Sequence, residues 1–350
     1  MTARLSAAQF NASVEHPTVR VVLRYLAWKN VRFRSTSFIE AIGVSGKFPL
    51  VSVGQLIAAA NACGVPLRGL HLDADELRTI ATPFLAYLKM PGAESDRTFL
   101  VPILRFGRSR VIMSEEGFAV HAMKLSEFIS RWTGIVLVSD DQARQTRAQS
   151  DVDKYRNDVR VLPDFLPKDH CQALIDYCEA SCFRRSRVAK RTGEGLVDQV
   201  SARDRSSSSV VLPDRSHPVI RPIYQHCAAL EQINERDIEN IQCVRYKRNQ
   251  KYFPHFDGGV GIPRTMTYLL YLNEDFEGGE TYFPVLDLKI RPTTGSCLRF
   301  ASCDKSGRIM WQSEHGGLPV SVGTKYALNI WVRRPTEVPT AIRAAMSDIR

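Results

Sequence analysis

The C-terminal half of the chain is a run of short apolar segments separated by turns. Each segment between residues 241 and 333 is rich in β-branched residues, and glycine- or proline-containing turns bound it. The predicted strands are residues 241–246, 265–272, 289–291, 296–301, 318–320 and 326–332. Many short strands at this spacing favour an antiparallel sandwich or jelly roll.

The N-terminal half has a different pattern. Apolar residues recur at three- and four-residue spacing over 18–29, 53–63 and 73–87, which predicts helices, and short strands follow at 98–105 and 109–113. A polar stretch near residues 140–158 separates the two halves. In the second half, the pattern predicts a strand at 159–162 and helices at 168–182 and 215–234. The whole chain is therefore expected to be α+β, with helices flanking the jelly roll.

A chain of 350 residues exceeds the usual size of a single core, so two domains are expected. We predict a smaller α+β domain over 1–140, a linker over 141–157, a main domain over 158–336 and a tail over 337–350. The composition, 44% hydrophobic and 24% charged, is that of a globular protein with little room for long disorder.

The sequence contains no membrane-spanning run, and its start lacks an apolar stretch followed by a cleavage site, so we expect a cytoplasmic protein. The eight cysteines are scattered, which favours reduced thiols over a disulfide framework. Cys178 and Cys182 lie four residues apart on a predicted helix, but no second pair completes a zinc site.

The chain carries a net charge of +10, and its basic residues cluster at 184–191 and 245–248. No helix-turn-helix, zinc-finger or aromatic stacking pattern accompanies these clusters, so we do not expect a nucleic-acid partner. An acidic protein or peptide substrate, or simply a solvated surface, accounts for the charge.

One short segment has the composition of a metal site. His255 and Asp257 are two residues apart, so a strand would point both side chains to the same face. His315 is the candidate third ligand. Two histidines and one carboxylate suit non-haem Fe(II), because they hold the metal on one face and leave three positions for cosubstrate and oxygen. A His-x-Asp pair alone is also common as a surface or capping pair.

Lys325 supports the metal interpretation. It stands just before the apolar segment at 326–332, where a cation could hold the far carboxylate of 2-oxoglutarate while the keto-acid end chelates iron. The alternative is an ordinary solvated lysine.

Several motifs follow in a distinctive order. They are Val244-Arg-Tyr246, Tyr252-x-x-His255-x-Asp257, Arg264-x-x-Thr267-x-x-Leu-Tyr271, Glu277-Gly-Gly-Glu-Thr281-x-Phe-Pro284, His315, Gly323-x-Lys325 and Trp331. Together they resemble the catalytic domain of prolyl 4-hydroxylases, and the likeness covers about residues 155–335. The resemblance implies a double-stranded β-helix with three sets of site residues, for iron (His255, Asp257, His315), for 2-oxoglutarate (Tyr246, Thr281, Lys325) and for the target proline (Tyr252, Arg264, Trp331).

The proline-lining trio is physically reasonable, because aromatic faces can pack a pyrrolidine ring and a guanidinium can hold a substrate carbonyl. Core packing is the alternative for Tyr252 and Trp331. The implied reaction uses Fe(II), O2 and 2-oxoglutarate, with ascorbate as a further candidate, and yields succinate and a hydroxylated prolyl residue. The family's substrate segment Arg-Thr-Ser reads Arg205-Ser-Ser here, so the peptide preference stays open.

Two other functions remain open. One is hydroxylation of a free amino acid or small metabolite. It is distinguished from peptide hydroxylation by whether free proline or peptides stimulate the decarboxylation of 2-oxoglutarate. The other is a non-catalytic peptide-binding or oxygen-sensing protein, which an absence of iron binding would favour.

Residues 1–140 resemble the papain-like cysteine peptidase domain at the front of bacteriocin-exporting ABC transporters. The matching motifs are Val22-Leu-Arg-Tyr25, the segment 53–64 and Leu125-Ser-Glu-Phe-x-x-x-Trp132-Thr-Gly. No cysteine precedes Cys63, and Thr98 stands where the family has its histidine, so the thiolate and its base are missing. We predict a degenerate peptidase fold that docks peptide substrate for the oxygenase, with a structural or dimerising role as the alternative.

Overall fold

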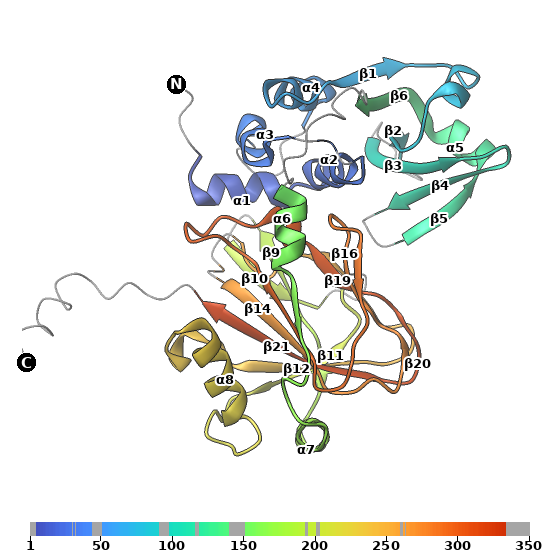
Figure 1. The fold of residues 1–350 in the computed structure, drawn as a ribbon. Helices are drawn as coiled ribbons and strands as arrows, with labels where there is room; N and C mark the ends of the chain where they lie inside the picture. Colours follow the sequence, from blue (N-terminus) through green and yellow to red (C-terminus); the bar gives the residue numbers. More distant parts are fainter. Residues whose placement is uncertain are drawn as a thin grey trace, which may run out of the picture.

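The computed structural model describes residues 5–29, 31, 33–43, 51–90, 98–115, 119–139, 151–192, 195–200, 204–259, 262 and 264–333. Two parts lie against each other (Figure 1), the N-terminal helices and their sheet at the top and a β-sandwich below. None of the helices in this described part of the chain has the length and apolarity that a bilayer-spanning helix requires.

The C-terminal part is built from two main antiparallel sheets. The seven-stranded sheet has the order β7-β18-β14-β21-β12-β11-β8, and the four-stranded sheet has the order β13-β19-β16-β17. In the same orders, the strands are β7 (Arg160–Leu162), β18 (Cys297–Ala301), β14 (Arg264–Tyr271), β21 (Lys325–Arg333), β12 (Ile241–Tyr246), β11 (Ser208–Leu212) and β8 (Arg184–Arg185), then β13 (Tyr252–His255), β19 (His315–Gly317), β16 (Thr281–Phe283) and β17 (Leu288–Ile290). This arrangement is consistent with the predicted jelly roll.

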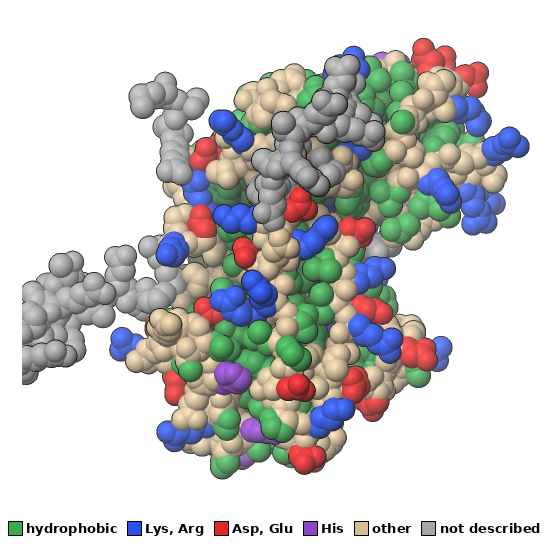
Figure 2. Space-filling model, viewed as in Figure 1, with side chains coloured by type: hydrophobic (Ala, Val, Ile, Leu, Met, Phe, Trp, Pro, Cys, Tyr) green, Lys and Arg blue, Asp and Glu red, His purple; other side chains and the backbone are tan. Residues whose placement is uncertain are grey.

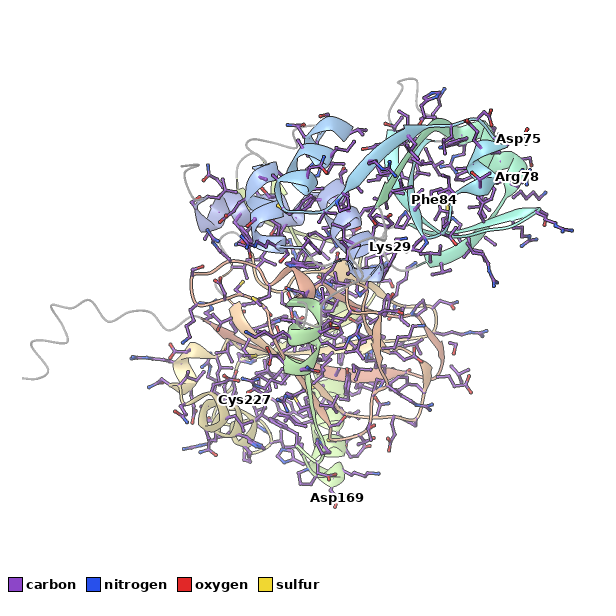
Figure 3. The ribbon with its side chains drawn as sticks, turned by 45° about the horizontal axis from the view of Figure 1, so that its top comes forward. Lys29, Asp75, Arg78, Phe84, Asp169 and Cys227 are labelled. Carbon is purple, nitrogen blue, oxygen red and sulfur yellow. The ribbon has the colours of Figure 1, made fainter. Side chains whose placement is uncertain are left out.

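Alternation along the strands of the large sheet supplies two cores. Ile241 and Cys243 of β12 face one side, where helices α7 (Lys168–Glu179) and α8 (Arg221–Glu231) cover the sheet. Val244 and Tyr246 belong to a second cluster, inside the sandwich. Cys227 of α8 is fully buried and lies in the lower part of Figure 3. Helices cover the outer face of the large sheet, so the inner face of the sandwich is the one that can hold a functional site.

Two smaller ribbons complete this part. β15 (Glu277–Gly278) pairs with β20 (Val320–Val322), and β9 (Val188–Thr192) pairs with β10 (Gly195–Gln199). The predicted strand at 318–320 thus begins two residues later, after Pro319, which has no N–H to donate to a ladder. The predicted helix at 215–234 forms only over α8, with Pro222 in its first turn, where proline is tolerated.

The N-terminal part places four helices beside one antiparallel sheet of order β1-β6-β2-β3-β4-β5. The helices are α1 (Ala7–Glu15), α2 (Pro17–Trp28), α3 (Ser35–Ile42) and α4 (Val53–Ala62), and a short α5 (Leu125–Arg131) follows β5. The strands are β1 (Leu67–His71), β2 (Phe84–Lys89), β3 (Thr98–Phe106), β4 (Arg110–Glu115), β5 (Ala119–Lys124) and β6 (Trp132–Ser139). The α+β composition agrees with expectation, whereas the papain-like assignment stays a prediction.

The helix predicted over 73–87 is wrong. Only a short 3-10 turn, η1 (Glu76–Thr79), forms there, and the later residues belong to β2. Pro83 cannot continue a helix, and the apolar run after it pairs with β3 and β6. Phe84 points into the core of this sheet, whereas Asp75 and Arg78 lie at the surface (Figure 3).

The two parts share one apolar core. Phe10, Val14 and Phe38 belong to the same buried cluster as Trp311 and Phe283 of the sandwich. Polar contacts also cross the boundary: Trp28 Nε1 donates to the Pro284 carbonyl at 2.9 Å, and Asn11 Nδ2 donates to the Gly307 carbonyl at 2.9 Å. The face seen in Figure 2 mixes Lys and Arg with Asp and Glu around apolar patches over both parts.

The expected linker at 141–157 is helical where it is described. α6 (Asp151–Asp158) runs between the two parts in Figure 1. Tyr155 is buried, and its hydroxyl donates to the Ala301 carbonyl. The apolar face of this helix therefore packs onto the sandwich, although its polar composition predicted an exposed segment.

Candidate active site

The three predicted metal ligands meet at one end of the four-stranded sheet. His255 ends β13 and His315 begins β19, and these strands pair so that the two histidines are direct partners. Asp257 follows β13 by two residues. Its Oδ1 lies 3.5 Å from His255 Nε2 and its Oδ2 lies 3.6 Å from His315 Nε2. One ligand atom from each residue lies within 4.8 Å of the others, which is the spacing of a shared cation.

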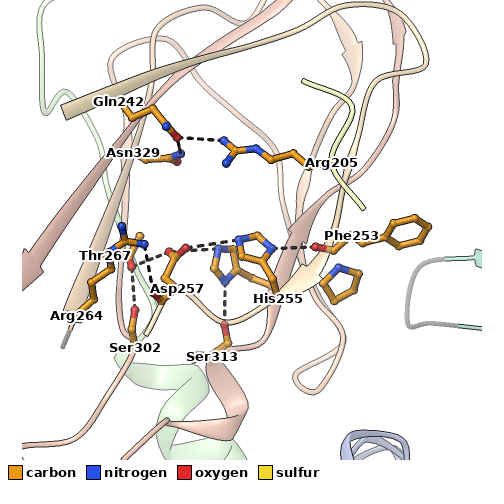
Figure 4. A network of polar contacts seen from close by, with 12 residues as sticks. Arg205, Gln242, Phe253, His255, Asp257, Arg264, Thr267, Ser302, Ser313 and Asn329 are labelled. Carbon is orange, nitrogen blue, oxygen red and sulfur yellow. Dashed lines mark hydrogen bonds and ion pairs between the residues drawn. The ribbon is translucent and has the colours of Figure 1, made fainter. Parts of the chain in front are cut away.

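Backbone carbonyls set the tautomer of both histidines (Figure 4). His255 Nδ1 lies 2.8 Å from the Phe253 carbonyl, and His315 Nδ1 lies 2.9 Å from the Ser313 carbonyl. Because a carbonyl only accepts, each Nδ1 donates to it, which leaves each Nε2 as the atom that would bind a metal. Each ring is thus oriented for metal binding by the backbone carbonyl two residues before it in the chain.

The carboxylate has its own support. Thr267 of β14 donates from Oγ1 to Asp257 Oδ2 at 2.8 Å, and Ser302 Oγ lies 2.8 Å behind Thr267 Oγ1. This contact leaves Oδ1 of Asp257 for a metal. Thr267 was part of a recognised sequence motif, but nothing in that motif indicated that it would support the carboxylate.

The protonation states suit Fe(II). Burial raises the pKa of Asp257, but the neighbouring histidines outweigh this and hold that pKa well below its usual range. Burial also lowers the pKa of His315 to about 4, so the ring is neutral near pH 7. The neutral His315 ring and the ionised Asp257 carboxylate, with the His255 ring on the same face, match the donor types of a non-haem Fe(II) site.

The predicted 2-oxoglutarate residues line the same hollow. Lys325 is 3% exposed, and its Nζ donates to the Gly279 carbonyl at 2.7 Å. It pairs across the sheet with Tyr246, and Thr281 Oγ1 lies 2.7 Å from the Tyr271 hydroxyl. Burial lowers the pKa of Lys325 to about 7.

The buried Lys325 amine donates to a carbonyl and forms no ion pair with any of the described residues. It can therefore pair with the carboxylate of an incoming ligand. The cosubstrate's far end would meet Lys325, Thr281 and Tyr246, while its keto acid would reach the metal. The residues present therefore fit both Fe(II) and 2-oxoglutarate.

A groove of about 880 Å³ contains all nine predicted site residues. Tyr252 stacks on His255 with ring centroids 3.6 Å apart. The Arg264 guanidinium lies 3.7 Å from the Trp331 ring centroid, and both oxygens of Glu239 accept from it, at 3.0 and 2.8 Å. The guanidinium is thus held in one orientation beside the metal ligands.

The structure adds Gln242 and Asn329, which sequence reasoning missed, and brings Arg205 of the Arg205-Ser-Ser segment against them. Arg205 donates to Gln242 Oε1 at 3.1 Å, and Asn329 Nδ2 donates to the same oxygen at 3.3 Å (Figure 4). Glu15 and Arg20 of the N-terminal part also line the groove. No local pattern marks such residues, because their role depends on contacts between distant segments.

Among the cysteines, Cys182 lines the groove, but none belongs to the ligand cluster found among the described residues. All eight are free, as expected, and Cys178 is buried while Cys182 is exposed. The ligand cluster found among the described residues contains neither of them. The structure therefore gives no support to a zinc site there.

Comparison with known proteins agrees with this geometry. Residues 241–333 match the model of the 2OG-Fe(II) oxygenase superfamily. Prolyl 4-hydroxylase 1 of Arabidopsis thaliana is 30% identical over 231 residues, which cover 59% of this chain and 78% of that protein. A putative prolyl 4-hydroxylase of Acanthamoeba polyphaga mimivirus is 28% identical over 197 residues, covering 53% and 77%.

One solved structure is also similar in sequence. A viral collagen prolyl hydroxylase from Paramecium Bursaria Chlorella virus-1, in a 2OG complex, is 26% identical. The match covers 50% of this chain and 96% of that chain, with a TM-score of 0.42.

Proposed function

Since this chain belongs to the prolyl 4-hydroxylase family of 2-oxoglutarate- and Fe(II)-dependent oxygenases, we propose that it hydroxylates prolyl residues within a peptide or protein. The observation that carries the proposal is the arrangement of Tyr252, Arg264 and Trp331 around the triad. Tyr252 stacks on a metal ligand, and Arg264 Nη1 lies 3.3 Å from the Asp257 carbonyl. A pyrrolidine ring held between these side chains would lie beside the metal.

The groups of this chain bind and orient rather than act as acids or bases. His255, Asp257 and His315 would hold Fe(II) on one face, and Lys325 would hold 2-oxoglutarate. Bound Fe(II) supplies the redox chemistry by which O2 gives one oxygen atom to the substrate C–H and the other to succinate, with release of CO2. Arg264, immobilised by Glu239, would donate to a peptide carbonyl and fix which C–H faces the metal.

Mass spectrometry of peptides incubated with the protein, Fe(II) and 2-oxoglutarate tests this proposal. We expect a proline-containing peptide to gain one oxygen, as 4-hydroxyproline, with one succinate formed per oxygen gained. The same peptide with alanine at the target position is the control and should stay unchanged. Oxygen gained by free proline or another metabolite, with no peptide modified, would instead favour the small-molecule alternative.

The charge of the groove favours a substrate with acidic residues near the target proline. Arg184 and Arg185 of β8 line the groove and are exposed, and neither has a carboxylate partner in the described part of the chain. Glu239 is already occupied by Arg264 and Arg333. An unneutralised pair of arginines at the groove attracts carboxylates, most strongly at low salt.

We expect a peptide with Asp or Glu flanking the proline to have about a tenfold lower KM than its Lys-flanked counterpart at low ionic strength. The double variant Arg184→Glu/Arg185→Glu should reverse this preference. Arg160→Glu, at the opposite edge of the same sheet, is the matched control. An unchanged preference in the double variant would contradict the interpretation of the groove's charge.

The N-terminal part contributes to this groove as well. Glu15 and Arg20 form part of its wall, and the Arg20 guanidinium lies 5.3 Å from the Phe256 ring centroid. These contacts support the proposal that residues 1–140 take part in docking the substrate.

A further inference from the structure

Two arginines of helix α2 bind a glutamate that immediately precedes a metal ligand. Glu314 is 1% exposed and stands next to His315. Its Oε1 accepts from Arg20 Nε at 2.5 Å and its Oε2 accepts from Arg24 Nε at 2.6 Å. The Nη2 atoms of both arginines also contact Oε1. The N-terminal part thereby neutralises a carboxylate buried beside the metal site.

Arg20 makes a second contact of the same kind. Its Nη2 donates at 2.8 Å to the carbonyl of Pro254, which immediately precedes His255. One guanidinium therefore bonds to the neighbours of both histidine ligands. Since His255 and His315 are cross-strand partners, this guanidinium joins the two strand segments that carry them.

We propose that Arg20 and Arg24 are positioning residues of the iron site, through which the N-terminal domain sets the metal affinity of the oxygenase. A buried carboxylate is stable only when it is paired and hydrogen-bonded, and the partners of Glu314 come from a separate part of the chain. If α2 withdrew, Glu314 would turn towards water. That rotation would displace the 313–315 segment, including the Ser313 carbonyl that orients the His315 ring.

Other contacts between the two parts provide a contrast. Arg308 Nη1 lies 3.1 Å from Glu40 Oε1, and Arg308 Nη2 donates to the Leu5 carbonyl at 3.0 Å. This arginine is also buried and also joins the two parts, but neither Glu40 nor Leu5 is a sequence neighbour of a metal ligand. If the arginines of α2 served only to attach the domains, loss of Arg308 would have the same consequence as loss of Arg24.

Titration of the full-length protein with Co(II), followed by the visible absorption of the bound ion, tests the proposal. We expect Arg20→Met and Arg24→Met each to weaken Co(II) binding by about 10- to 100-fold, the range for groups that orient metal ligands. Arg308→Met is the matched control and should change the Co(II) Kd less than about twofold, even where it lowers Tm. The readout requires no substrate, so it is independent of the proposed prolyl hydroxylation.

Arg24→Met leaves Glu314 with fewer partners in a buried position and could impair folding. The double variant Arg24→Met/Glu314→Gln removes the buried charge together with its partner, and it should fold and still bind Co(II) weakly. Unchanged Co(II) affinity in folded Arg20→Met and in the double variant would overturn the proposal. An equal loss of affinity in Arg308→Met would overturn it as well.

Discussion

Asp257→Ala is expected to abolish succinate formation and metal binding. Asp257 is the one anionic member of the ligand cluster, and its Oδ1 and Oδ2 lie 3.5 and 3.6 Å from the two histidine Nε2 atoms. Without it, two neutral imidazoles remain, which cannot balance the charge of Fe(II) or complete its facial coordination. We expect turnover to fall by at least about 1,000-fold, or ~4 kcal/mol in the barrier. Succinate release measured with saturating 2-oxoglutarate and peptide would check this.

Metal-linked stability separates loss of the site from loss of the fold. Co(II) should raise Tm of the unmodified protein, because the ion binds the folded state alone, and it should leave Tm of Asp257→Ala unchanged. Asp176→Ala, an exposed carboxylate on α7, is the control and should behave as the unmodified protein. Full turnover in Asp257→Ala would contradict the assignment of the triad.

The parts of the fold that could be predicted are those encoded locally. β12 forms over the predicted residues 241–246, because alternating apolar residues there serve two buried faces. The shared site of His255 and Asp257 could also be predicted, because side chains two residues apart on extended backbone face the same side. In contrast, the helix expected at 73–87 was wrong, since an apolar run interrupted by Pro83 suits strand β2 better.

The parts that could not be predicted depend on contacts between distant segments. The sequence marked neither Arg20 nor Arg24 as a site residue, yet Arg24 is 3% exposed and pairs with a residue 290 positions away. Glu239 was equally unmarked, although it holds Arg264 from the segment just before β12. The Arg24–Glu314 pairing follows from the docking of the two parts, and the Glu239–Arg264 pairing follows from the folding of the sandwich, so no local periodicity reveals either of them.

Lys325→Met is expected to raise the Kd for 2-oxoglutarate by about 100-fold or more while leaving Co(II) binding unchanged. The Lys325 amine is buried and donates a hydrogen bond to the Gly279 carbonyl, and it has no ion-pair partner among the described residues, so it is placed to pair with a carboxylate. Losing a buried charge-assisted contact costs several kcal/mol when the other charge remains, here about 3. Methionine has a similar length but no charge. A Kd within twofold of the unmodified protein would remove Lys325 from this role.

The same lysine predicts how 2-oxoglutarate binding depends on pH. Burial lowers the pKa of Lys325 to about 7 without cosubstrate, and a bound carboxylate favours the protonated form and so raises that pKa. Below pH 7 the lysine is already protonated, so the Kd should be flat. Above pH 7 binding must take up a proton, so the Kd should rise by up to about tenfold per pH unit. Calorimetry of the Co(II)-loaded protein from pH 6 to 9 measures this Kd. The Lys325→Met variant should bind 2-oxoglutarate weakly, with a Kd that does not rise with pH. A flat profile in the unmodified protein would contradict the prediction, because it would mean that the amine stays protonated throughout.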